Sequence, residues 1–267
     1  MNINSILNKL DNSQKSSESR LFELLRFKSI STNSIYKADC FKAAEWLVKQ
    51  LSEIGFSSSL KETDGNPIII AHSDNQKPDL LFYGHYDVQP VDPENLWETK
   101  PFEPVIQETN NGPVIRARGA ADDKGQLMTF IEACRAIKDV EGKLPCKISI
   151  LLEGEEETSS PSLIPFLKGH VEELKSKYAL VCDTGMWDEK TPSITSSLRG
   201  MLSEEITIRG PDKDLHSGIF GGAAPNPLQI LAKLIAGLHT ASGKVNIPGF
   251  YDGVEATSLE LLNTWSK

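Results

Sequence analysis

The stretch LLFYGHYDVQP, residues 80–90, decides the fold class of this chain. It begins as an apolar run of strand length and turns polar at His85 and Asp87. Other apolar runs end in carboxylates in the same way: Asp122 in RARGAADDKGQ, Glu156 and Glu157 in LLEGEEETSS, and Asp183 in ALVCDTG. In an α/β sheet, sites are built at the carboxyl ends of the strands, so we expect these side chains to converge there.

Strand-length runs alternate with helical patterns along most of the chain. The runs are PIIIA (67–71), LLFYG (80–84), VIRA (114–117), KISILL (147–152) and YALVC (178–182). Two helices are expected to open the chain, and a further helix that carries Cys40, Leu47 and Leu51 should stop at Gly55. Another helix is expected from Lys124. Nearly all-apolar strands between helices indicate an α/β fold with a mainly parallel sheet flanked by helices.

The last quarter of the chain has a different pattern. SEEITIR (203–209) alternates as a half-exposed strand would, and the Gly- and Pro-rich loop HSGIFGGAAPNP (216–227) follows it. A helix with Leu228 on its apolar face is expected next. We therefore predict a first domain over residues 1–194 and the start of a second over residues 195–267.

Composition excludes several classes of partner. The chain has 267 residues, 39% of them hydrophobic and 24% charged, with a formal net charge of −9. This negative charge argues against nucleic acid and anionic membranes, and no apolar run reaches the length of a membrane span. The polar first residues predict no secretory signal. Four widely spaced cysteines without a CxxC pair are typical of reduced thiols in a cytoplasmic protein.

His85 and Asp87 alternate at the end of a strand, so both side chains point to one side of the sheet. A metal-bound imidazole usually donates its other N–H to an oxygen acceptor. His85 is therefore a candidate metal ligand and Asp87 a candidate partner that orients it. A surface histidine beside a turn-forming aspartate explains this pair of residues equally well when the pair is taken alone.

Asp122 and Asp123 come directly before the helix expected from Lys124. For a lone aspartate in this position, an N-cap is the better interpretation. The small residues 119–121 favour a functional role, because they let backbone and ions approach closely. A carboxylate here can bridge two cations, and a cis peptide bond after Asp122 is one hypothesis for this segment.

A dense acidic run follows the strand KISILL, and it contains Glu153, Glu155, Glu156 and Glu157. Acidic runs are often solvated surface. Here a buried strand ends directly in the run, and cations would offset the repulsion between its charges. One glutamate can then bind metal while its neighbour acts as general base. Asp183 also follows a strand, although alone it is more typical of a turn. Such oxygen and imidazole ligands suit a hydrolytic centre with two metal ions.

Two further residues are candidates with less support. His216 lies in the loop DLHSGIFGG, where glycines permit close approach of a substrate, but it also fits a loop histidine without a role. Arg199 in SSLRG is a candidate ligand for a substrate carboxylate, or an ordinary surface cation.

Five ordered motifs resemble a known metallopeptidase family. GHYDVQP, RGAADDKG, EGEEETSS, CDTG and DLHSGIFGG are similar to the family of carnosinase, carboxypeptidase G, aminoacylase and succinyl-diaminopimelate desuccinylase, and to its bacterial carnosinase-type dipeptidases most of all. The resemblance extends from about residue 60 to the end of the chain. It implies a zinc-exopeptidase-like catalytic domain with an inserted α+β lid that also forms a homodimer.

The resemblance also implies a role for each candidate residue. His85 and Asp183 would bind one divalent ion, Asp122 would bridge, and Glu157 would bind the second ion. Glu156 would be the general base and Asp87 the partner of His85. His216 would steady the oxyanion in the partner subunit's active site, and Arg199 would lie at the junction of the catalytic domain and the lid. Zinc is the expected metal, with manganese or cobalt as alternatives.

One part of the family pattern has no counterpart in this sequence. The family's second ion takes a further histidine that follows the lid, so we expect the chain to correspond to about the first half of such an enzyme. Either the reading frame is truncated or another chain supplies the remainder. The expected activity is hydrolysis of the amide bond in dipeptides or similar small peptides. The alternatives are an N-acyl-amino-acid deacylase or desuccinylase on the same scaffold, or an inactive fragment that lacks the last ligand.

Overall fold

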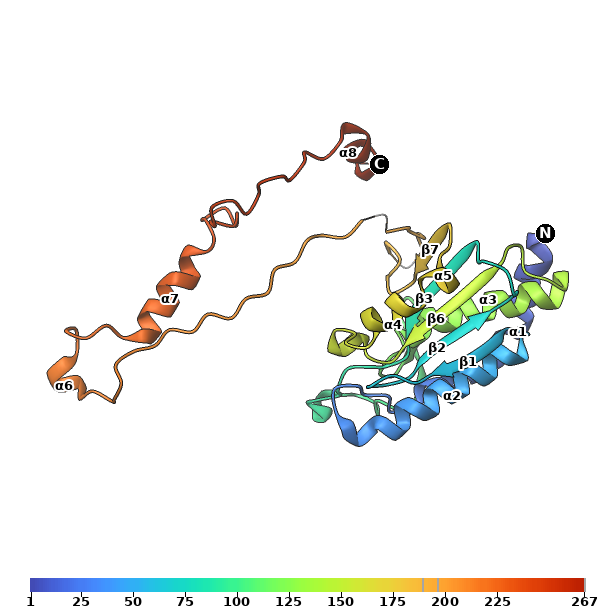
Figure 1. The fold of residues 1–267 in the computed structure, drawn as a ribbon, viewed down its shortest axis with the longest axis horizontal. Coiled ribbons are helices and arrows are strands. Elements are labelled where there is room, and N and C mark those ends of the chain that lie inside the picture. Colours follow the sequence, from blue (N-terminus) through green and yellow to red (C-terminus); the bar gives the residue numbers. More distant parts are fainter. Residues whose placement is uncertain (189, 196, 267) are drawn as a thin grey trace. The chain divides into compact units, whose positions relative to one another are not determined.

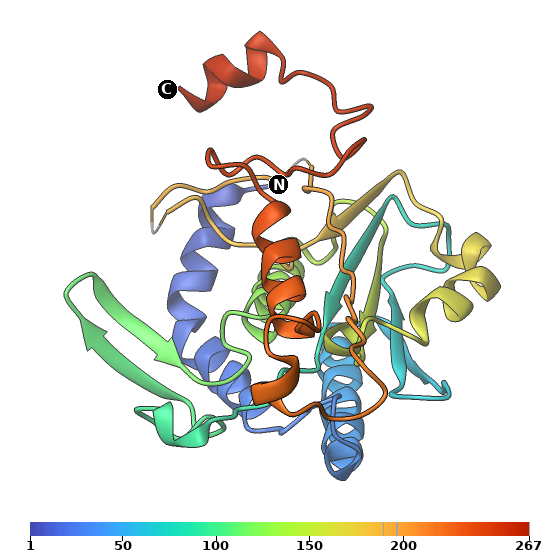
Figure 2. The same cartoon turned by 90° about the vertical axis from the view of Figure 1, so that its left-hand side faces the viewer.

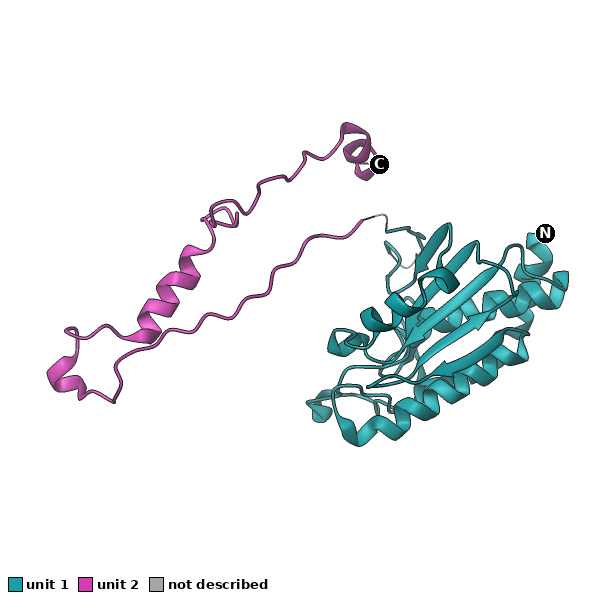
Figure 3. Ribbon diagram, viewed as in Figure 1, with its two compact units in different colours: residues 1–196 teal, residues 197–267 magenta. Residues whose placement is uncertain are grey.

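The computed structural model describes residues 1–188, 190–195 and 197–266. The chain forms two compact units, Met1–Ser196 (unit 1) and Ser197–Lys267 (unit 2), coloured separately in Figure 3. The sequence places its domain division between residues 194 and 195.

Unit 1 is built on a five-stranded sheet in the order β1-β2-β6-β3-β7 (Figure 1). The strands are β1 (Ser57–Lys61), β2 (Ile68–His72), β3 (Leu80–His85), β6 (Ile148–Glu153) and β7 (Tyr178–Val181). β3 is parallel to both β6 and β7, whereas β2 is antiparallel to β1 and β6. All strands except β2 therefore run in one direction, which confirms the predicted α/β fold with its mainly parallel sheet.

Helices cover both faces of this sheet. The helices are α1 (Ile3–Leu25), α2 (Lys37–Glu53), α3 (Lys124–Glu141), α4 (Leu163–Gly169) and α5 (Val171–Leu174). Alternate residues of β2 point to opposite faces. Ile69 packs in the core formed with α1, α2 and α3, while Ile70 packs in a smaller core with residues of α4 and α5.

The structure corrects two expectations for unit 1 and adds one strand, β1. The opening segment forms one continuous helix, α1, where the sequence predicts two, because no glycine or proline interrupts it. VIRA lies in β5 (Gly112–Arg116), which pairs with β4 (Val105–Thr109) in a separate antiparallel hairpin. Figure 2 shows this hairpin in green, projecting from unit 1. β1 escapes sequence prediction because its SSSLK sequence has one apolar residue.

Other helical expectations are confirmed. α2 contains buried Cys40, Leu47 and Leu51 and is followed by Gly55 at φ 82°. α3 begins at Lys124 and buries Leu127. Short 3₁₀ turns lie between the larger elements: η1 (Ser34–Tyr36), η2 (Glu94–Leu96) and η3 (Glu156–Thr158).

In its described residues, unit 2 forms three helices joined by extended segments. They are α6 (Ser217–Phe220), α7 (Pro227–Gly237) and α8 (Leu259–Trp265). The helix predicted around Leu228 is thus present as α7. The strand predicted over residues 203–209 is not formed. A strand requires a hydrogen-bonded neighbour, and no described segment pairs with these residues. Across the described residues, every helix is too short or too polar to cross a membrane.

Candidate metal centre

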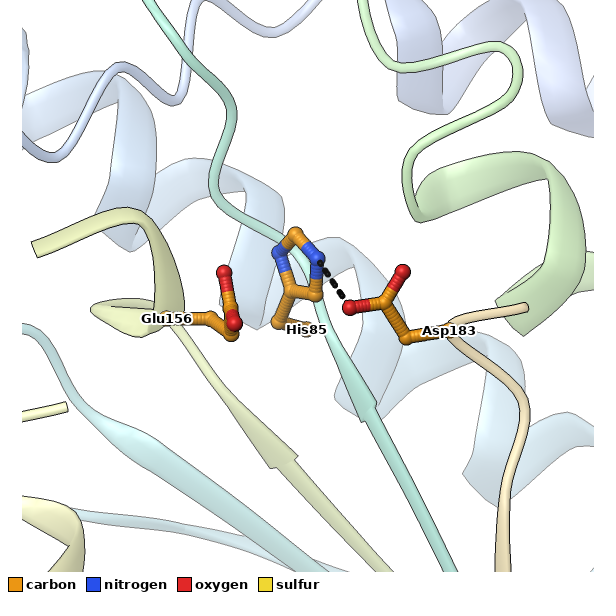
Figure 4. A group of neighbouring side chains, drawn as sticks. All are labelled: His85, Glu156 and Asp183. Carbon is orange, nitrogen blue, oxygen red and sulfur yellow. Dashed lines mark ion pairs between the residues drawn. The ribbon is translucent and has the colours of Figure 1, made fainter. Parts of the chain in front are cut away.

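Three parallel strands deliver their carboxyl ends to one edge of the sheet. His85 is the last residue of β3, η3 begins with Glu156 shortly after β6, and Asp183 follows β7. Ligand atoms of these three side chains all lie within 4.8 Å of one another. Figure 4 shows the imidazole between the two carboxylates. Strand ends predicted from separate motifs therefore meet at one point, as the α/β architecture requires.

Asp122 joins this group from the loop before α3. Its Oδ1 lies 3.1 Å from His85 Nε2, and Asp183 Oδ2 lies 3.7 Å from the same nitrogen. The Asp122 side chain is 61% exposed, whereas that of His85 is fully buried. The peptide bond from Asp122 to Asp123 is cis, as hypothesised. One buried imidazole nitrogen thus faces two carboxylates that are both open to solvent.

The buried carboxylate of Asp87 fixes the opposite side of the imidazole. His85 Nδ1 lies 3.1 Å from the Asp87 carbonyl oxygen and 3.3 Å from Asp87 Oδ1. Both atoms are acceptors, so Nδ1 carries the proton and donates. The Asp87 carboxylate also accepts hydrogen bonds from the backbone N–H groups of Glu156 (3.2 Å) and Glu157 (3.1 Å). Asp87 therefore orients both the histidine and the glutamate loop.

The electrostatics of this edge favour bound cations. Burial opposes the charged imidazolium, but the hydrogen bond and charge of Asp87 outweigh it and raise the pKa of His85 to about 10. Burial, followed by the charge of nearby carboxylates such as Glu157, raises the pKa of Glu156 above its usual range. Burial and the charge of Asp122 do the same for the pKa of Glu157. Positive charge placed among these groups would relieve their repulsion.

The donor set fits a divalent metal ion. It combines an imidazole whose Nε2 is directed at the cluster with several carboxylates, which are ligands for zinc, manganese and cobalt. A further buried oxygen, Asp123 Oδ1, has no hydrogen-bond partner among the described residues. The second oxygen of Asp123 accepts the backbone N–H of His85 at 3.1 Å.

The structure sorts the acidic run into two pairs. Glu153 is buried and accepts hydrogen bonds from Tyr83 Oη (2.5 Å) and Ser160 Oγ (2.9 Å). Glu155 accepts the backbone N–H of Asn66 at 3.2 Å and of Ser162 at 3.3 Å. The carboxylates of Glu153 and Glu155 are therefore used in bonds that hold the loop after β6. The carboxylates of Glu156 and Glu157 do not take part in these bonds. The acidic run by itself does not distinguish the four, and only the family resemblance gives Glu156 and Glu157 separate roles.

Sequence reasoning also misses residues that support the site. Asp123 occupies the N-cap position of α3, yet its side chain makes no capping bond there and binds the His85 backbone instead. Gln89 Nε2 donates to Glu157 Oε2 at 2.6 Å. The only sequence signal for either residue is its place within a motif that already carries a candidate ligand.

The two remaining candidates belong to unit 2. His216 is exposed and caps α6, where its Nδ1 accepts the backbone N–H of Gly218 at 2.9 Å. Arg199 is exposed in the extended segment that begins the unit. Unit 1 alone brings together His85, Asp87, Asp122, Glu156 and Asp183, and the catalytic and substrate-binding roles of His216 and Arg199 stay predictions.

Comparison with known proteins identifies relatives over most of the chain. The chain is 31% identical to the Cys-Gly metallodipeptidase DUG1 of Saccharomyces cerevisiae over 264 residues, which is 92% of this chain and 54% of that protein. It is 34% identical to the human Beta-Ala-His dipeptidase over 203 residues, 74% of this chain and 39% of that protein. The chain spans about half the length of the first curated relatives it matches.

Solved structures share the fold. The M20 family metallo-carboxypeptidase Sso-CP2 from Sulfolobus solfataricus superposes with a TM-score of 0.71 and 31% identity, over 91% of this chain and 54% of that chain. The pattern of Peptidase family M20/M25/M40 matches residues 81–260, a range that includes every candidate ligand described above. With this match over most of its length, the chain belongs to Peptidase family M20/M25/M40.

Proposed function

We propose that this chain carries the metal-dependent centre of a dipeptidase that hydrolyses the amide bond of dipeptides or similar small peptides. The observation that carries the proposal is the buried imidazole of His85, whose Nε2 faces Asp122 and Asp183 at the carboxyl edge of a mainly parallel sheet. Relatives named as a Cys-Gly metallodipeptidase and a Beta-Ala-His dipeptidase support the substrate class.

The proposed ligand roles are those that the family resemblance implies, and the positions of Asp122 and Asp183 beside His85 Nε2 support them. His85 and Asp183 would hold one divalent ion, Glu157 would hold a second, and Asp122 would be shared by the two. Such ions supply Lewis acidity toward the scissile carbonyl and lower the pKa of a water molecule. Zinc is the metal we propose, and manganese or cobalt would suit the same oxygen and nitrogen donors.

Glu156 is the proposed general base. Its backbone N–H is held by Asp87, while no hydrogen bond occupies its carboxylate in the described part of the chain. The carboxylate is therefore free to take a proton from the attacking water and to deliver it to the leaving amine. Burial and neighbouring carboxylates raise the pKa of Glu156, which makes it a stronger base than an ordinary glutamate.

Unit 2 has a proposed role in substrate contact and assembly. We propose that it forms a homodimer, that His216 steadies the oxyanion in the partner subunit's active site, and that Arg199 binds a substrate carboxylate. The exposed positions of both residues support contact with another molecule. A cytoplasmic location is proposed from the four cysteines, all of which are free thiols.

Metal content and substrate choice together test the proposed function. The full chain would be dialysed against zinc or manganese, and bound metal per chain would be measured by elemental analysis for the parent and for Asp122→Asn. Hydrolysis of Cys-Gly and β-Ala-His would be compared with that of N-acyl amino acids. We expect metal in the parent and preference for dipeptides. Preference for N-acyl substrates would assign a deacylase instead, and absence of metal and turnover would overturn the proposal.

A further inference from the structure

The last residues of α1 and the residues that follow them contact both loops that carry the candidate ligands. We call residues 24–30 the brace, residues 85–88 the histidine arm and residues 119–124 the aspartate arm. The brace lies about 60 residues before the first arm and about 90 before the second along the chain. None of its side chains is a metal ligand in the proposed function. Its contacts with the two arms therefore call for another explanation.

The brace is bonded to the histidine arm by side chain and backbone. Buried Ser29 donates from Oγ to the Tyr86 carbonyl oxygen at 2.7 Å. The Val88 N–H donates to the Ser29 carbonyl oxygen at 2.9 Å, and Ile30 forms a parallel β-bridge with Val88. These bonds hold the chain on both sides of Asp87.

Lys124 bonds the brace to the aspartate arm. The side chain of Lys124 is fully buried, and its Nζ donates to the Phe27 carbonyl oxygen at 2.9 Å and the Leu24 carbonyl oxygen at 3.2 Å. These carbonyls lie at and just beyond the C-terminal end of α1, where a cation is stabilised by the helix dipole. A methionine of similar volume would fill the same space without the cost of burying an ammonium group. The feature that only the lysine provides is its hydrogen bonds to the two carbonyl oxygens.

The histidine arm and the aspartate arm are also bonded directly to each other. The His85 N–H donates to Asp123 Oδ2 at 3.1 Å. Gly119 of the aspartate arm approaches the histidine arm closely, since a Cβ added there would lie 2.9 Å from Val88 Cγ1. The distance between His85 Nε2 and Asp122 therefore depends on how both arms are seated on the brace.

We propose that Lys124 is a positioning residue, which bonds the aspartate arm to the brace and thereby holds Asp122 at its distance from His85. The printed bonds of Lys124 Nζ go to backbone carbonyls of the brace, so in this proposal Lys124 acts through the backbone of residues 122–124. The consequence for metal affinity rests on the proposed function. The consequence for the seating of the two arms does not.

Amide hydrogen exchange of the metal-free full chain tests the seating of the arms. Lys124→Met keeps the side-chain volume and removes the bonds to the brace. The His85 amide, bonded to Asp123, should exchange at least tenfold faster, while the Ile150 amide in the middle of β6 reports global opening and should change much less. An unchanged exchange rate at His85 would overturn the proposal.

Lys138→Met is the matched control. Lys138 is also on α3, and its Nζ also donates to a backbone carbonyl just beyond a helix, that of Gly55 after α2, at 3.4 Å. The same substitution there should leave His85 exchange as in the parent. Equal acceleration by both variants would show a general loss of stability and would overturn the role of Lys124.

Ser29→Ala provides a second variant if Lys124→Met does not fold. It removes one bond between the brace and the histidine arm, so the amides of Val88 and His85 should both exchange faster. Faster exchange at Val88 with unchanged exchange at His85 would contradict the proposal, because the brace would then not set how the arms meet.

Metal titration separates this inference from the proposed function. Calorimetry would measure the affinity of each protein for zinc or manganese. Lys124→Met should bind the metal at least tenfold more weakly than the parent and Lys138→Met do. A parent chain that binds no metal would contradict the proposed function, and the exchange rate at His85 would still decide the role of Lys124. Equal affinity in all three proteins would overturn the inference alone.

Discussion

Asp87 Oδ1 lies 3.3 Å from His85 Nδ1, and both side chains are fully buried. The same carboxylate accepts the backbone N–H groups of Glu156 and Glu157. One carboxylate therefore controls the tautomer of a candidate ligand and the position of the loop with the candidate base. This coupling makes Asp87 as important for the site as the residues that would contact metal.

Asp87→Asn should weaken metal binding without unfolding the chain. The amide offers a single acceptor oxygen and directs its NH₂ group toward a donor, so either the imidazole or the glutamate loop loses its partner. We expect metal affinity to fall about 10-fold to 100-fold, measured by calorimetry with zinc or manganese. Asp74→Asn, at an exposed turn, is the control and should bind as the parent does. Parent-like affinity of Asp87→Asn would contradict its orienting role.

Glu156→Gln should retain metal and lose turnover. The glutamine keeps the size of the side chain but cannot accept the proton of the attacking water, and loss of a general base lowers kcat by about 100-fold to 10,000-fold. Dipeptide hydrolysis and metal content would be measured on the same preparation. Glu157→Gln is the matched variant. Because Glu157 is a proposed metal ligand, this variant should lose bound metal, whereas Glu156→Gln should keep it. Near-full activity of Glu156→Gln would remove it as the base.

Asp122→Asn should lose both ions. A neutral amide is a weaker ligand than a carboxylate, and Asp122 is the proposed ligand shared by the two ions. The expected metal content after dialysis is well below that of the parent, by elemental analysis. Unchanged metal content with this variant would show that Asp122 does not bridge.

Gly65→Ala should destabilise the loop that presents the glutamates. A Cβ at this position would lie 1.6 Å from Glu155 Oε1, so Glu155 would have to give up its bonds to the backbone. We expect the free energy of unfolding to fall by about 1–3 kcal/mol in urea titrations. Gly169→Ala, where an added Cβ meets nothing within 4 Å, should be neutral or slightly stabilising. Equal stability of the two variants would refute the close contact.

Glu132 should contribute stability that is lost in acid. Burial opposes its ionisation, but hydrogen bonds from Arg20 and Ser17 outweigh it and lower the pKa of Glu132. A carboxyl whose pKa is lower in the folded state stabilises the fold above its unfolded pKa, about 4.3, and loses this contribution as pH falls toward its folded pKa.

Chemical denaturation between neutral and acidic pH tests this contribution. Glu132→Gln should lower the free energy of unfolding by about 2 kcal/mol at neutral pH and show a shallower decline below pH 5 than the parent. Glu45→Gln, on the exposed face of α2, should follow the parent curve. Parallel curves for the parent and Glu132→Gln would contradict the assignment.

Regular periodicity made much of unit 1 predictable. β2, β3, β6 and β7 are short apolar runs, and α2 and α3 repeat apolar residues at helical spacing. The weakly apolar β1 and the hairpin of β4 and β5 could not be placed in this way, because strand pairing depends on distant segments. Residues 203–209 alternate like a strand and form none for the same reason.

The sequence by itself determined the α/β class, the strand ends that carry His85 and Asp183, and the family motifs that contain Asp122 and the glutamates, since these depend on local patterns. Only the tertiary structure decided what Glu153 and Glu155 bond to, that Asp123 binds the His85 backbone, and what Lys124 bonds. Those contacts join residues that lie far apart in the chain, and their geometry follows from how helices and strands pack. Local periodicity contains no information about such distances.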